Sequence, residues 1–405
     1  MTETGGVGLV VEPKREWSRQ VAIVGVGETD FGADYKAARA QAPGYEAPDA
    51  ASLALRAFER ALTDAGLQRE DVDGLSVSLI YGGAEPAEMA QVLGITPRFI
   101  TRGGGIMAGT IPAAVAALMS GQCDTIALVY AAASRAIGRR FGGATYTNAG
   151  PVSYYYYHPW GWSSQAAHWA LIFRYYMNTH GATEADLGAV AMTLRRHASI
   201  NDNAIMRTPL SIEDYLGSRY IVSPLHLFDM CLVNDGGLCI ILRRRDMAEA
   251  LRHTPVLVAG WGHAEIHRRK LHHLVRERLR PQFAEAGEQA FAMAGLGRDD
   301  MQHFQGYDAS SIHLVQQLEG YGFAGTGEGL EFFKAGHASL GGRLPVNTSG
   351  GLLSEAYMHG WNHIVEATRQ LRHEAAGHQI EGIETSFFSM ATTQEVDPVI
   401  LVRGA

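Results

Sequence analysis

The apolar positions of this 405-residue chain follow two alternating patterns. Short uninterrupted apolar runs at Val21–Gly27, Val72–Leu79 and Thr125–Ala131 predict buried strands. Helical spacing of apolar residues marks Ala50–Ala65 and Ile106–Met119, which lie between those runs. Strands and helices that alternate at this separation predict a mostly parallel α/β sheet.

The helix predicted at Ala50–Ala65 carries signals at both of its ends. Asp49 precedes it as an N-cap, a position where a carboxylate accepts a hydrogen bond from a free N–H of the first turn. Gly66 follows it as a stop, because glycine readily adopts the left-handed conformation that ends many helices. The helix is therefore expected to begin and end at these residues.

The C-terminal part of the chain repeats the earlier order. Strands are predicted at Leu238–Leu242, Pro255–Gly260, Ile380–Phe387 and Val399–Arg403. A glycine turn leads into a predicted helix at Gly360–Ala375, which leads into a strand as in the first part. This weak repeat predicts two similar α/β halves around a shared interface.

The segment from about 134 to 222 differs from both halves and predicts an inserted lobe rather than more sheet. It contains the aromatic stretch Tyr154–Trp162 and two helices with polar faces, predicted at Trp169–Thr179 and Glu184–Ile200. The aromatic stretch could line a pocket for a large apolar substrate, cover a protein interface or pack the lobe itself. The predicted division is an N-terminal arm (1–18), an N-terminal half (19–270) that includes the lobe, and a C-terminal half (271–405).

Composition and charge narrow the class of protein. The 47 glycines favour an α/β enzyme over a helical bundle, and the net charge of −8 gives nucleic-acid binding no electrostatic support. Three scattered cysteines predict neither a disulfide framework nor a zinc site. No apolar run reaches the ~20 residues of a membrane span, and the first residues lack the layout of a signal peptide, so a cytoplasmic protein is expected.

Two glycine motifs invite a dinucleotide-binding interpretation, and neither supports it. Gly25-Val26-Gly27 lacks the third glycine, and Gly320–Gly325 matches G-x-G-x-x-G but follows a helix-like segment rather than a strand. His359 and His363 are spaced i, i+4 without an acidic residue between them, which indicates a helix surface or a pocket wall. No metal site is predicted.

Two further segments could meet an anion. Gly103–Gly105 stands before the helix predicted from Ile106, where backbone N–H groups could hold a developing enolate oxygen or simply form a tight turn. The basic segment from His267 to Arg280 could meet the phosphates of an acidic cofactor or a partner protein, or form a solvated helix face.

Several motifs in a fixed order resemble thiolases of the sterol-carrier-protein X and lipid-transfer type. They are Val21–Phe31, Ser223–Asp229 with Asn234–Gly237, Gly306-Tyr307-Asp308 with the helix that follows it, and Leu344–Leu353. The resemblance covers nearly the whole chain, from about residue 19 to 403. It implies a thiolase fold, in which two βαβαβαββ halves stack as a five-layer α/β sandwich with an inserted loop lobe, and usually a homodimer.

This sequence departs from the thiolase pattern at the catalytic positions. A thiolase carries a nucleophilic cysteine before the helix that follows its third strand, where this chain has Gly104 or Gly105. The second thiolase cysteine is also missing, since the corresponding loop reads Ser389–Thr392. Tyr357 replaces the histidine of the thiolase G-H-P motif. Acyl transfer through a cysteine is therefore not expected.

The remaining pattern is similar to the thiolase-like aldolases of bacterial steroid side-chain degradation. The resemblance implies cleavage of a β-hydroxyacyl-CoA into a ketone and a shorter acyl-CoA, propionyl-CoA or acetyl-CoA, with no bound cofactor. It also implies a small OB-fold and zinc-ribbon partner protein. Two tyrosines carry proton transfer in that family, and their positions match Tyr307 and Tyr357.

A retro-aldol step requires a base, an acid and stabilisation of an enolate. Tyr307 and Tyr357 are predicted to share the proton transfers in either order, and His313 and His359 are candidates to tune them. Backbone N–H groups of Gly104 and Gly105 are predicted to hold the enolate oxygen. Asp308 could equally be a helix cap for the segment that follows it. Two alternatives stay open: a thiolase-like acyltransferase with an unusual nucleophile, and a non-catalytic acyl-CoA- or lipid-binding subunit.

Overall fold

The fold is described from a computed structural model, in which ten strands form one hydrogen-bonded sheet. The described residues are 10–41, 43–78, 84–103, 109–138, 158–160, 162, 164–248, 251–265, 280–392 and 395–404. The strands of the N-terminal half are β1 (Val21–Glu28), β2 (Gly74–Ser78), β3 (Phe99–Arg102), β4 (Thr125–Ala133) and β7 (Asp235–Arg244). Those of the C-terminal half are β8 (Val256–Trp261), β9 (Ala264–Glu265), β10 (Phe304–Gly306), β11 (Thr385–Ala391) and β12 (Glu395–Arg403).

The two halves share one strand order and meet at β1 and β8. The N-terminal half runs β3-β2-β4-β7-β1 and the C-terminal half runs β10-β11-β12-β8, with β9 beside β12. A parallel bridge from Phe304 to Val346 takes the place beside β10 that β3 has beside β2. Antiparallel pairing of β1 with β8 joins the halves. The prediction of two similar α/β halves is therefore confirmed.

The prediction of a mostly parallel sheet is wrong. Only β2 with β3, β2 with β4, and β10 with β11 pair in parallel, and the other pairs are antiparallel. The reason is visible between β11 and β12, where the chain turns back over a few residues without a crossover helix. A connection that short can only produce an antiparallel neighbour.

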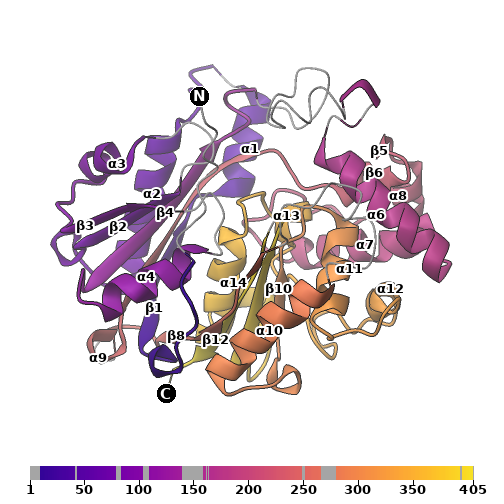
Figure 1. The fold of residues 1–405 in the computed structure, drawn as a ribbon. Coiled ribbons are helices and arrows are strands. Elements are labelled where there is room, and N and C mark those ends of the chain that lie inside the picture. Colours follow the sequence, from indigo (N-terminus) through magenta and orange to yellow (C-terminus); the bar gives the residue numbers. More distant parts are fainter. Residues whose placement is uncertain are drawn as a thin grey trace.

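Helices cover both faces of the sheet and also fill the space between the halves. The outer helices α2 (Ala50–Ala65) and α3 (Pro86–Leu93) lie against the N-terminal strands, and α10 (Arg280–Ala294) lies against β8 and β12 (Figure 1). The inner helices α4 (Thr110–Met119) and α14 (Trp361–Arg372) contribute to one apolar cluster shared by both halves. This order of helix, strand, helix, strand and helix layers is the predicted five-layer thiolase sandwich.

The inserted lobe is mainly helical and stands at one side of the sandwich, drawn in magenta in Figure 1. It comprises α6 (Gln165–His180), α7 (Glu184–Ser199), α8 (Ile212–Gly217) and a small hairpin of β5 (Tyr220–Val222) and β6 (Leu225–His226). The prediction that the lobe has no sheet is wrong at this hairpin. The division of the chain at residue 270 stays a prediction, since β8 lies before it and pairs with strands of both halves.

The remaining helices of the described residues are short. They are α1 (Phe31–Ala40), α9 (Arg245–Ala248), α11 (Ser311–Gly320), α12 (Gly329–Lys334) and α13 (Gly351–Ser354). Three of them, α11, α12 and α13, contact α7 of the lobe. Within the described part of the chain, no helix is long and apolar enough to cross a membrane.

Local sequence signals predicted both ends of α2 correctly, but the start of β11 and the end of α14 wrongly. Asp49 caps α2 by accepting a hydrogen bond from the N–H of Ser52 at 2.7 Å, and Gly66 ends it with a φ of 68°. The strand predicted from Ile380 begins only at Thr385, because the N–H of Ile380 binds the Gln370 side chain instead of a neighbouring strand. α14 ends at Arg372 rather than Ala375, because His373 adopts a left-handed conformation.

Gly27 is required by the close packing of β1 on α2, and not by a nucleotide. A Cβ at Gly27 would lie 2.1 Å from the backbone oxygen of Ala57. We therefore expect Gly27→Ala to lower the free energy of unfolding by about 3 kcal/mol, because a rigid helix backbone cannot yield. Gly217→Ala is the control, since its Cβ would meet nothing within 4 Å. Urea denaturation of both variants tests this, and equal midpoints would contradict it.

Candidate active site

The candidate site is formed by two tyrosines of the C-terminal half that lie in direct contact. Tyr307 follows the carboxyl end of β10, and Tyr357 lies in the loop between α13 and α14. Their hydroxyl oxygens are 3.0 Å apart, and either can be the donor. Tyr307 is 7% exposed and Tyr357 is 9% exposed, so the pair is largely shielded from bulk water. The two residues predicted to carry proton transfer are thus brought into direct contact.

Side-chain amides hold the backbone on the Tyr307 side. The Gln317 amide on α11 accepts from the N–H of Tyr307 at 3.1 Å and donates to its carbonyl oxygen at 2.8 Å. Asn347 makes the same two-point contact with Gly306, at 2.8 and 2.9 Å. Four hydrogen bonds around two residues leave this turn little freedom.

Tyr357 is held by groups from two other segments. Its N–H donates to Oδ1 of Asn234 at 2.7 Å, just before β7. The Asp308 carboxylate accepts from the N–H groups of Leu352 and Leu353 at 3.0 and 3.3 Å, in the first turn of α13. Asp308 is therefore a cap, as the sequence alternative held, but of α13 and not of the helix that follows it in sequence. The cap links the loop of Tyr307 to the segment that leads to Tyr357.

A fully buried ion pair supports this cap. Nε2 of His363 lies 3.0 Å from Oδ1 of Asp308, and both side chains are inaccessible to water. Nδ1 of His363 lies 2.7 Å from Oε1 of Gln305, whose amide nitrogen in turn faces His303 at 3.0 Å. Both nitrogens of the His363 ring are therefore held, one by Gln305 and the other by Asp308.

The polar chain continues through the interior beyond His303. Thr348 lies 3.0 Å from Nε2 of His303 and donates to Glu366, which pairs with His378 at 3.1 Å. Burial raises the pKa of Glu366, but the charge and hydrogen bond of His378, together with Thr348, outweigh burial and lower it to about 2. A connected set of hydrogen-bonded polar groups of this kind rigidifies the core behind the tyrosines.

The two candidate tuning histidines lie on opposite sides of the tyrosine pair. His359 is 5% exposed, and its ring centroid lies 4.6 Å from that of Tyr357. His313 donates from Nε2 to the carbonyl oxygen of Ala391 at 2.9 Å, and its ring meets Tyr307 edge-on at 6.2 Å. The interpretation of His359 and His363 as a helix surface is wrong, since both are buried and His359 precedes α14. Their roles in tuning stay predictions.

Several predicted residues lie outside the described part of the chain. These include Gly104 and Gly105, most of the aromatic stretch 154–162, and most of the basic segment 267–280. Gly103 is described and continues the ladder from β3, where its N–H donates to the carbonyl oxygen of Val77 at 2.9 Å. The predicted enolate contact near Gly104 stays a prediction.

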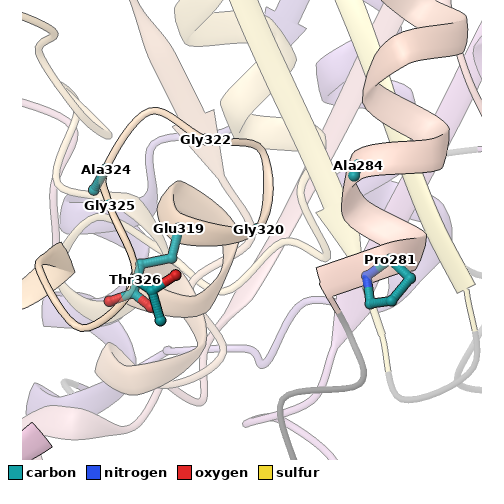
Figure 2. A pocket seen from close by; sticks show the side chains of 8 residues that line it. All are labelled: Pro281, Ala284, Glu319, Gly320, Gly322, Ala324, Gly325 and Thr326. Atoms are coloured by element: carbon teal, nitrogen blue, oxygen red, sulfur yellow. The ribbon is translucent and has the colours of Figure 1, made fainter.

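The G-x-G-x-x-G segment lines a cavity of about 480 Å³ that contains neither tyrosine (Figure 2). The segment follows α11, as predicted, and the cavity lies between it and the start of α10. Glu319 in its wall accepts from the hydroxyl of Tyr176 at 2.6 Å and from the N–H of Gly329 at 2.9 Å. A carboxylate at this place opposes phosphate binding, which agrees with the rejection of a dinucleotide site.

One histidine and two carboxylates form a second polar cluster. In the described part of the chain, His263, Glu395 and Asp397 are the one such group whose potential ligand atoms lie within 4.8 Å of one another. His263 donates from Nδ1 to Asp397 at 2.6 Å, and burial raises the pKa of Glu395 to about 7. Residues this far apart in sequence offer no ligand spacing, so no sequence signal pointed to them.

Buried histidines make the fold sensitive to acid. Burial lowers the pKa of His168, His197, His303 and His313 to about 4, from an ordinary value of 6.5. Between these values the unfolded chain binds more protons than the folded one, so stability falls as the pH falls. We expect a loss of up to ~1.4 kcal/mol per pH unit for each histidine. Urea denaturation at pH 7, 6 and 5 measures this, and pH-independent midpoints would refute it.

Comparison with known proteins first gives the class. Residues 264–397 match the family model described as thiolase C-terminal domain-like. The fold is similar to that of an acetyl-CoA acetyltransferase from Syntrophomonas wolfei, with a TM-score of 0.67 at 14% identity, covering 95% of this chain and 100% of the other. The fold and the matching family model define a thiolase-superfamily protein.

Closer relatives give the family. A steroid side-chain-cleaving aldolase from Thermomonospora curvata is 34% identical over 87% of this chain and 90% of its own length. A 17-hydroxy-3-oxo-4-pregnene-20-carboxyl-CoA lyase from Mycobacterium tuberculosis is 34% identical over 95% of this chain and 99% of its own. The solved Ltp2–ChsH2(DUF35) aldolase matches with a TM-score of 0.83 and 31% identity, covering 96% of this chain and 98% of the other. The chain therefore belongs to the thiolase-like steroid side-chain-cleaving aldolases and is a carbon–carbon lyase, as predicted.

Proposed function

We propose that this chain cleaves a steroid-type β-hydroxyacyl-CoA by a retro-aldol reaction in which Tyr307 and Tyr357 transfer the protons. The observation that carries the proposal is the 3.0 Å contact between their hydroxyls, in a buried site held by Gln317, Asn234 and Asp308. Two phenols in contact can remove one proton and deliver another, but neither readily carries an acyl group.

The reaction balances without a redox cofactor or a covalent nucleophile. One tyrosine, as a phenolate, takes the proton of the substrate's β-hydroxyl. The bond between the α- and β-carbons breaks, the β-carbon becomes a ketone, and the electron pair passes into a thioester enolate. The other tyrosine then protonates the α-carbon and yields the shorter acyl-CoA. An ordinary phenol has a pKa near ~10, so the hydrogen bond between the two hydroxyls is needed to favour the phenolate.

The cysteines do not favour the alternative of an acyltransferase. Burial, aided by the negative charge of Asp308, raises the pKa of Cys231 to about 12, although it lies near the site. Burial likewise raises the pKa of Cys123 to about 12, and that of Cys239 is also raised by burial. A thiol that stays protonated is a poor nucleophile, since the thiolate is the reactive form.

The names of the relatives support the choice of substrate. One relative is a steroid side-chain-cleaving aldolase, and another is a lyase of 17-hydroxy-3-oxo-4-pregnene-20-carboxyl-CoA. We take the substrate here to be a CoA thioester with a tertiary β-hydroxyl, cleaved to a ketone and propionyl-CoA or acetyl-CoA. Incubation with steroid and aromatic β-hydroxyacyl-CoA thioesters, followed by mass spectrometry, tests this. An acylated protein would indicate acyl transfer, and binding without turnover would indicate a binding subunit.

The working form is proposed to include a partner protein. The solved aldolase with 31% identity is a complex of Ltp2 with ChsH2(DUF35), which supports a partner protein for this chain. We take that partner to be the small OB-fold and zinc-ribbon protein that the family resemblance implies, and this chain to form a homodimer. Co-expression with such a protein from the same genome is expected to raise kcat at least about 10-fold, if the partner completes a water-excluding site. Equal kcat with and without the co-purified partner would contradict this expectation.

A further inference from the structure

His168 and Trp169, near the start of α6, present buried polar atoms that the fold leaves unbonded. His168 is 3% exposed, and neither of its ring nitrogens has a hydrogen-bond partner among the described residues. Trp169 is also 3% exposed, and its Nε1–H lacks a partner there as well. Buried polar groups in folded proteins are nearly always hydrogen-bonded. Three open positions on adjacent residues therefore point to a binding partner outside the chain.

These atoms lie on the lobe side of the tyrosine pair. The ring of Trp169 lies 4.2 Å from that of His313, which in turn meets Tyr307 at 6.2 Å between centroids. His168 lies beyond Trp169, at 5.1 Å from its ring and 6.1 Å from Trp162. Figure 1 shows α6 of the lobe beside α11, the helix that carries His313. A row of aromatic rings thus connects the tyrosine pair with the unbonded nitrogens of His168 and Trp169.

The nitrogens of His168 and Trp169 suit an uncharged oxygen as their hydrogen-bond partner. Burial lowers the pKa of His168 to about 4, with a smaller contribution from His313, so its ring is uncharged near neutral pH. A neutral imidazole offers one N–H donor, and the indole of Trp169 offers another. A carbonyl oxygen has two lone pairs and accepts two such donors. Phosphates and carboxylates are instead bound by arginine, lysine or helix N-termini.

We infer that His168 and Trp169 form a subsite for a keto oxygen on the acyl part of the substrate, at a distance from the thioester. The inference rests on the proposed function, because it takes the acyl-CoA as the ligand. The reacting carbons lie at Tyr307 and Tyr357, while Trp169 and His313 separate them from His168.

The test compares two CoA thioesters that differ only in whether a ring carbon carries a ketone or a methylene. The complex of this chain with its partner is expected to show about 10- to 100-fold higher kcat/KM for the ketone. His168→Phe keeps an aromatic ring and removes both nitrogens, so the ratio should fall toward one through loss on the ketone alone. Trp169→Phe should lower the ratio partly. Trp160→Phe is the control and should leave it unchanged, since Trp160 is 86% exposed.

Other results would overturn the inference. If His168→Phe lowers kcat/KM equally for both thioesters, His168 serves packing and the subsite does not exist. A variant with a lower unfolding temperature still gives a valid ratio, because both substrates meet the same folded fraction. If the wild-type complex cleaves neither thioester, the proposed function fails. Binding of the same thioesters, followed by tryptophan fluorescence, then decides: tighter binding of the ketone that His168→Phe abolishes supports the subsite, and equal Kd values overturn it.

Discussion

Tyr357→Phe is expected to lower kcat for retro-aldol cleavage by about 100- to 10,000-fold, which is the usual contribution of a positioned acid or base. The variant keeps the ring that packs beside His359 and removes only the hydroxyl, which lies 3.0 Å from that of Tyr307. Because the tyrosines act as a pair, Tyr307→Phe should have a similar effect, and the double variant should lose little more. Single-turnover product formation measures the chemical step directly.

The control for these variants is Tyr220→Phe. Tyr220 is 50% exposed and donates to Glu184 at 2.9 Å on the surface of the lobe. Its loss should leave kcat unchanged. Wild-type rates in both Tyr307→Phe and Tyr357→Phe, with thermal unfolding unaltered, would remove the tyrosines from the mechanism.

Asp308→Asn is expected to reduce both stability and activity, through the ion pair with His363 and the cap on α13. Removing one partner of a buried hydrogen-bonded pair costs about 1–3 kcal/mol, because the other polar group is left without its partner in the interior. Loss of the cap should also loosen the tyrosine contact, and a displacement of about 1 Å costs roughly 100-fold in kcat. Urea denaturation and kcat with the same substrate measure the two effects.

Two variants separate the ion pair from a general effect of removing a carboxylate. Asp202→Asn removes a carboxylate that is 96% exposed and paired with Arg207 at 2.8 Å, and it should change the free energy of unfolding by less than about 1 kcal/mol. The double variant Asp308→Asn with His363→Gln replaces both partners of the pair and should regain part of the stability without regaining kcat. Full recovery of kcat in the double variant would show that the cap does not position the tyrosines.

The fold was predictable because its signals are local and repeated. The cap at Asp49 and the stop at Gly66 gave the limits of α2, and the strand and helix alternation gave the two halves. The direction of β12 was not predictable in this way, since it depends on how a short turn brings two strands together. The start of the strand predicted from Ile380 was wrong for a related reason. An apolar run does not show that the N–H of Ile380 donates to the side chain of Gln370 instead of to a neighbouring strand.

The site was predictable only in part. The motifs that resemble the family contain Tyr307 and Tyr357, and the structure brings their hydroxyls together. Asn234 and Asn347 also lie within those motifs, so a signal existed for the residues that hold the tyrosine turns. Gln317 lies in the helix that follows Gly306-Tyr307-Asp308, which the resemblance covers, but its contact with the Tyr307 backbone depends on how that helix packs against the strand end.

Hydrogen bonding between β1 and β8 also has a consequence for the order of events during synthesis. Ala22 pairs with Leu257, so this edge of β1 is unsatisfied until β8 has also been made. Contacts of such long range form slowly, and an open strand edge is a place where other chains can attach. The contact between the tyrosines forms later still, because it needs Asn234 before residue 300 and both Tyr307 and Tyr357 after it. Competence for chemistry is thus acquired only after both halves have been made, and premature termination anywhere before Tyr357 leaves a protein without its second phenol.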